Sequence, residues 1–156
     1  MLFLIPAYLS EESPIDYFAP SIKEYILKIS EKHTVASAGT ISFHEGEHPD
    51  KRSTKTAQEH GVDISHQRAN YFTEKHLEDF DKIFCMDLKN LEDVLSKVKS
   101  EEQRSKVSLI MEEVGVLSDE KIEVPDPYYG DMSDFEKVYQ MLDQACEAIV
   151  KKYELR

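Results

Sequence analysis

The sequence has few cysteines, no excess of basic residues and no long apolar run, and each absence excludes a class of protein. Two cysteines among 156 residues cannot form a disulfide framework, which favours a reducing compartment such as the cytoplasm. With no Cys-x-x-Cys pair and six scattered histidines, we expect neither a structural zinc site nor another cofactor. The formal net charge of -12 argues against nucleic acid as a partner, since that requires clustered lysine and arginine.

Membrane segments are also not expected. No apolar run approaches the roughly 20 residues that are needed to cross a bilayer. The apolar residues 1–5 lack a basic flank and a small-residue cleavage site, so they predict a buried strand and not a signal peptide.

Short apolar runs alternate with stretches of helical spacing along the chain. The runs that predict strands are 2–5, 34–38, 82–86 and 107–111. Helical spacing begins near Pro20, at Lys51, after Asp87 as a capping residue, and near Ser133. This alternation predicts one α/β domain over residues 1–156, with three layers in which helices flank a parallel sheet.

Four groups of residues follow one another in a characteristic order. They are 37–40 with His44, Gly46, Asp50 and Arg52; 61–69; 80–87 with Asn90; and 126–130 with Phe135 and 138–139. On these residues, the sequence from 34 to its end resembles the low-molecular-weight protein tyrosine phosphatases. The resemblance implies a four-stranded parallel sheet flanked by helices, in agreement with the arrangement predicted from the periodicity.

The reaction of this family requires a thiolate nucleophile, a phosphate cradle completed by an arginine, and an acid for the leaving phenolate. In the family, a loop of the form C-x-G-N-x-C-R-S-P joins the first strand to the first helix and supplies the first two. Here Ser13 and the proline after it match the end of that loop. Reading back without gaps, Glu12 stands at the arginine position and Pro6 at the cysteine position.

Both replacements oppose the chemistry. Proline offers neither a nucleophile nor a backbone donor, and Glu12 would place negative charge where a phosphate dianion must bind. A shifted alignment cannot restore the loop, because residues 1–33 contain no cysteine and no arginine. The sequence therefore predicts a family member whose first 33 residues are atypical, lack the phosphate-binding loop and do not support catalysis.

The first thirty residues carry a different resemblance. The run 2–6, followed by Leu9, Glu12, Pro14 and Pro20, is similar to the opening of the tetrapyrrole-methylase type of S-adenosylmethionine methyltransferase. No methyltransferase activity follows from it, because the rest of such an enzyme is absent. A natural divergence, a chimera and a misfused reading frame are alternatives for its origin.

Several residues keep the positions that the family uses. The resemblance implies that Asp126 is the inherited general acid, that Tyr128, Tyr129 and Ser13 contact substrate, and that a further set supported the loop by hydrogen bonds: Ser37, His44 and Asp87. Simpler roles remain open, namely a proline-flanked turn with exposed tyrosines, a helix cap at Ser13, and strand-end or capping positions for the supporting set. Cys85 and Cys146 are expected to be buried apolar residues and not nucleophiles.

Three functional hypotheses follow. The first is a phosphatase-family protein without activity. The second is an active phosphatase that hydrolyses a phosphotyrosine protein or an aryl phosphate, with Asp126 as acid and an unrecognised nucleophile. The third is an interaction protein that a tyrosine kinase phosphorylates on Tyr128 or Tyr129, beside the acidic residues Asp131 and Asp134.

Overall fold

The structure is a computed structural model that describes residues 2–7, 34–40, 42, 45–115 and 123–153. Its strands are β1 (Leu2–Ala7), β2 (Thr34–Gly39), β3 (Lys82–Cys85) and β4 (Val107–Leu109). They form one sheet in the order β2-β1-β3-β4, and every pairing is parallel. The predicted four-stranded parallel sheet is confirmed.

The helices agree with the prediction less completely. They are α2 (Lys51–Glu59), α3 (Glu74–Asp79), α4 (Leu88–Leu95), α5 (Glu101–Arg104) and α6 (Met132–Lys152), with a 3-10 helix η1 (Ile110–Val114). The short helices α3 and α5 were not predicted. The predicted strand 107–111 is two residues too long, because Ile110 and Met111 turn into η1. The helix predicted near Pro20 lies outside the described residues.

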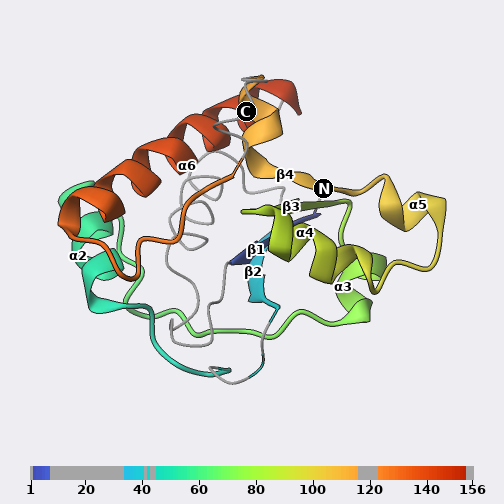
Figure 1. Ribbon diagram of the computed structural model, residues 1–156, viewed down its shortest axis with the longest axis horizontal. Coiled ribbons are helices and arrows are strands. Elements are labelled where there is room, and N and C mark those ends of the chain that lie inside the picture. Colours follow the sequence, from blue (N-terminus) through green and yellow to red (C-terminus); the bar gives the residue numbers. More distant parts are fainter. Residues whose placement is uncertain (1, 8–33, 41, 43–44, 116–122, 154–156) are drawn as a thin grey trace.

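Helices cover both faces of the sheet, with α6 on one side and α4 on the other (Figure 1). The alternation of side chains along β3 separates the two packing layers. Phe84 belongs to the cluster beneath α6, whereas Ile83 and Cys85 belong to the cluster that contains Val94 of α4. The predicted three-layer arrangement therefore follows from one buried strand that contributes to both cores.

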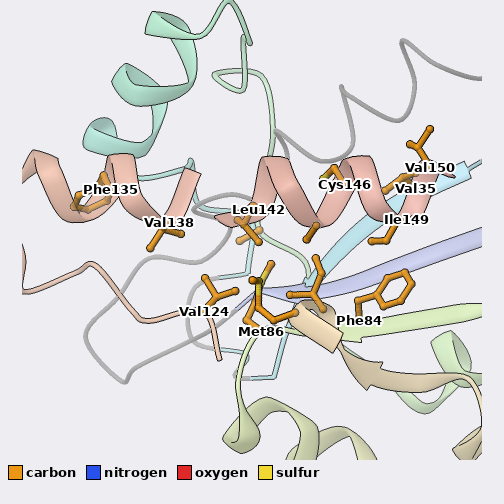
Figure 2. Close-up of a cluster of buried hydrophobic side chains, with 14 residues drawn as sticks. Val35, Phe84, Met86, Val124, Phe135, Val138, Leu142, Cys146, Ile149 and Val150 are labelled. Atoms are coloured by element: carbon orange, nitrogen blue, oxygen red, sulfur yellow. The ribbon is translucent and has the colours of Figure 1, made fainter. Parts of the chain in front are cut away.

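The cluster beneath α6 is the larger of these two layers. Figure 2 shows Phe84, Met86 and Val124 pointing toward the inner face of α6. The α6 residues in this cluster are Phe135, Val138, Leu142, Ala145, Cys146, Ile149 and Val150. Their spacing of three and four residues places them on one side of the helix. An aspartate at each end of the capping box, Asp131 and Asp134, fixes where α6 begins.

Among the described residues, no helix is both long enough and apolar enough to cross a membrane.

Candidate functional site

In the family the phosphate-binding loop follows the first strand. Here that strand, β1, is longer than predicted. The strand continues through Pro6 and Ala7, and Pro6 pairs in register with Ala38 of β2. The pairs with β3 cover only Phe3 and Leu4, so Pro6 lies beyond them. Proline has no backbone N–H to donate to a neighbouring strand, although its carbonyl can still accept a hydrogen bond. A strand tolerates this missing donor near its end. Pro6 is thus a strand residue and not the first residue of a loop.

Three of the residues singled out in the sequence are not placed by the structure. Glu12, Ser13 and His44 lie outside the described residues, so their roles remain predictions. Ser37 is described, and it lies buried in β2 opposite Ile5 of β1.

Asp87 follows β3 directly after Met86, and its side chain is buried with a relative exposure of 8%. One carboxylate oxygen accepts a hydrogen bond from the backbone N–H of Asn90 at 2.7 Å. This bond confirms that Asp87 is the N-cap of α4. Burial raises the pKa of Asp87, and the nearby charges of Glu123 and Asp126 raise it further, against the lowering effect of the Asn90 and Lys89 amides.

The segment 123–130 lies beside the connection between β3 and α4. The backbone N–H of Val124 donates to the carbonyl of Met86 at 2.8 Å, and the N–H of Leu88 donates to Glu123 Oε1 at 2.8 Å. These bonds bring Asp126 into electrostatic range of Asp87, although the two residues are far apart in sequence. Leu88, the first residue of α4, is 50% exposed, and only its backbone N–H is bonded to this segment.

Asp126 sits in a tight turn. Its Oδ1 accepts a hydrogen bond from the N–H of Tyr128 at 2.9 Å, and the N–H of Gly130 donates to the carbonyl of Pro127 at 2.9 Å. The rings of Tyr128 and Tyr129 meet edge to face, with their centroids 5.0 Å apart. Tyr128 is half-buried and Tyr129 is 76% exposed. The turn therefore combines the carboxylate that was predicted as the acid with one shielded and one open tyrosine.

Arg52, near the start of α2, contacts this turn. Its Nη1 donates to the carbonyl of Tyr128 at 2.9 Å, while Nε and Nη2 donate to the two carboxylate oxygens of Asp50 at 3.2 and 3.1 Å. The family resemblance includes Arg52 and Asp50 only as landmarks and implies no role for them. A positive charge in the first turn of a helix, two residues after an aspartate, was the available signal.

Neither cysteine is placed to attack a phosphate. Cys85 lies inside β3 and Cys146 on the inner face of α6, and both are buried, as predicted. Burial is the largest cause that raises the pKa of each thiol, and Asp87 adds to it for Cys85, as Asp143 does for Cys146. A buried thiol with a raised pKa is not a nucleophile near neutral pH.

Within the described part of the chain, no group of three histidine, cysteine or acidic side chains is arranged to hold a metal ion. The described part of the candidate site thus contains the carboxylate of Asp126, the rings of Tyr128 and Tyr129, and the buried carboxyl group of Asp87. The carboxylates of Glu123 and Asp126 lie within electrostatic range of Asp87 and contribute to the raised pKa of its carboxyl group.

Comparisons with known proteins identify the family. A family model described as low molecular weight phosphotyrosine protein phosphatase matches residues 20–155. The human low molecular weight phosphotyrosine protein phosphatase is 37% identical over 126 residues, which are 80% of this chain and 77% of the human protein. The protein of the same name from Saccharomyces cerevisiae is 32% identical over 118 residues, which cover 76% of this chain and 72% of the yeast protein.

Solved structures show the same fold. The crystal structure of a protein tyrosine phosphatase from Entamoeba histolytica, with Hepes in its active site, superposes with a TM-score of 0.85. It is 28% identical, and the similarity covers 99% of this chain and 97% of that one.

Proposed function

Since the chain belongs to the low molecular weight phosphotyrosine protein phosphatase family, we propose that it is a member without phosphatase activity. The observation that carries the proposal is the composition of residues 1–33, which contain no cysteine and no arginine. The family's nucleophile and phosphate-binding arginine belong to the loop after the first strand. That loop corresponds to residues 6–14, which precede the segment that the family model matches.

The chemistry explains why the loss is decisive. The family's route transfers the phosphoryl group to a thiolate of the protein, and a thiol that stays protonated cannot take that role. Both cysteines of the chain lie in packed cores, with their thiol pKa values raised. An acid such as Asp126 can protonate a leaving group only if something displaces that group.

Glu12 adds an electrostatic argument. At the position of the arginine, a carboxylate repels the phosphate dianion that the arginine would attract. On the described side of the site, Glu123 and Asp126 add negative charge within electrostatic range of Asp87. Substrate binding and phosphoryl transfer are therefore both opposed.

Steady-state hydrolysis of p-nitrophenyl phosphate by the purified protein tests the proposal. We expect no release of p-nitrophenol above that of the Asp126→Asn variant, with the human relative as a positive control. Turnover that disappears in Asp126→Asn would support the alternative of an active phosphatase instead. The double variant Cys85→Ser with Cys146→Ser then shows whether that turnover depends on a thiol.

A second candidate function is that of an interaction protein that a tyrosine kinase modifies. The observation that favours it is the 76% exposure of Tyr129, one residue after the shielded Tyr128 and near the acidic Asp131. Incubation with a tyrosine kinase and ATP, followed by peptide mapping, is expected to find phosphate on Tyr129. No modification at Tyr128 or Tyr129 would count against this function.

A further inference from the structure

We propose that Arg52 is a positioning residue that holds the segment 126–130 in its turn, so that the inherited acid and aromatic wall are preformed. This inference deepens the proposed function, because Asp126 and Tyr128 belong to the half of the site that the chain keeps. Its test does not measure phosphate release, so either proposal can fail without the other.

The first support is the pattern of hydrogen bonds. Arg52 binds Asp50 with two parallel N–H donors, a planar arrangement that fixes the direction of the guanidinium. The third donor, Nη1, then reaches the carbonyl of Tyr128, which lies 76 residues further along the chain. A charged donor on that carbonyl connects the start of α2 to the centre of the turn.

The second support is the stacking of the same side chain. The guanidinium carbon of Arg52 lies 5.4 Å from the ring centroid of Tyr128 and 4.5 Å from that of Phe135. Phe135 is fully buried near the start of α6 (Figure 2), so Arg52 contacts a rigid core ring as well as a ring of the turn. Arginine binds aromatic faces in this way while its edge continues to donate hydrogen bonds.

The third support is that helix stability does not explain an arginine at this position. Arg52 is the second residue of α2, where the positive end of the helix dipole disfavours a cation. Asp50 already caps the helix through the backbone N–H of Arg52 at 2.6 Å, which requires no particular side chain at position 52. The benefit of the arginine therefore lies in its contacts with Asp50, Tyr128 and Phe135.

Amide hydrogen exchange measured by NMR tests this role. In Arg52→Gln, we expect exchange at the Tyr128 and Gly130 amides to rise at least about tenfold, because a charged hydrogen bond that closes the turn is lost. The Ile83 amide, which donates to Lys106 across the β3–β4 edge, serves as the internal reference and should not change. Arg104→Gln, on the exposed face of α5, is the matched control and should leave all three amides unchanged.

Two further variants keep the test decisive if Arg52→Gln does not fold. Arg52→Lys retains one charged donor but not the paired geometry, so it should restore part of the protection at Tyr128. Asp50→Asn keeps a capping side chain for α2 and removes the carboxylate that orients Arg52, so it should loosen the same two amides to a smaller extent. Unchanged exchange at Tyr128 and Gly130, or an equal rise at Ile83, in the variants that fold would overturn the proposal.

Nitration with tetranitromethane gives an independent readout on the side chains. In the wild-type protein, we expect modification of the open Tyr129 well before the shielded Tyr128. Arg52→Gln should bring the two rates together. Equal rates already in the wild-type protein would contradict the shielding that the stacked guanidinium provides.

Discussion

The central strands β1 and β3 are paired in parallel, and the segments that follow them differ in what they keep of the family. After β3, Asp87 caps α4 and the segment 123–130 is bonded to Met86 and Leu88. Around β1, residues 1–33 contain no cysteine and no arginine. The residues retained after β3 also hold the fold together, whereas a nucleophile contributes to chemistry alone. Under the proposed function, the family fold and the family reaction depend on separable sets of residues.

The largest expected effect on the free energy of unfolding comes from the buried cluster beneath α6, which contains Phe84 of β3. Phe84→Ala removes a fully buried ring from beneath α6, and we expect the free energy of unfolding to fall by about 3–5 kcal/mol. Leu88→Ala truncates a half-exposed side chain and should change the free energy of unfolding by no more than about 0.5 kcal/mol. Urea denaturation measures both values. Similar losses in the two variants would contradict the packing described here.

Gly130→Ala tests how tightly the turn closes onto α6. A methyl group at this position would come within 2.8 Å of the Cβ and Cγ of Asp134, whose carboxylate accepts the Asp131 amide in the capping box. We expect a loss of about 1–3 kcal/mol in the free energy of unfolding, because the clash displaces that side chain. Asp134→Ala combined with Gly130→Ala should recover part of it, and thermal denaturation would show whether it does.

A smaller effect is expected at the cap after β3. Asp87→Ala removes the acceptor for the Asn90 amide and should cost about 0.5–2 kcal/mol. Asp87→Asn keeps an oxygen in the same place and removes a buried charge, so its loss at neutral pH should be smaller. Urea denaturation of both variants checks the order. An equal loss would mean that the cap requires the charge.

The dependence on pH sharpens this comparison. Because burial raises the pKa of Asp87 above its ordinary value of 3.8, the folded protein binds this proton more tightly than the unfolded chain. The contribution of Asp87 to the free energy of unfolding is therefore greatest at acid pH, and it declines as the pH rises from 3.8 through the raised pKa. Asp87→Asn lacks this decline. Denaturation at a series of pH values should show the variant gaining relative to wild type across that window, and a constant difference would refute the assignment.

The sheet and the long helices could be predicted because their signals are local. Short apolar runs indicated the strands, and a spacing of three and four residues indicated α6. The helices α3 and α5 have only six and four residues, too few for a period to emerge. Ile110 and Met111 continue an apolar run, so the sequence does not indicate that the strand has ended. In the structure they belong to the 3-10 helix η1 and pack beneath α6.

The site could be predicted only in part, because only some of its contacts are local in the sequence. The cap at Asp87 is a local pattern, and the structure confirms it. The position of Arg52 two residues after Asp50 is visible in the sequence, but its contact with a backbone carbonyl 76 residues away has no side-chain signal at the acceptor, so that partner could not be predicted. Pro6 was expected at the start of a loop, and its pairing with Ala38 depends on a neighbouring strand.

The most direct test of the central claim is a search for the covalent phosphoprotein that the family's reaction would form. The purified protein is mixed with a radiolabelled phosphotyrosine peptide, quenched in denaturant within milliseconds, and separated from the peptide, with the human relative as a positive control. We predict no label on this chain, because residues 1–33 offer no thiol and both cysteines are buried. Label on any residue of the chain would contradict this account and would identify the nucleophile.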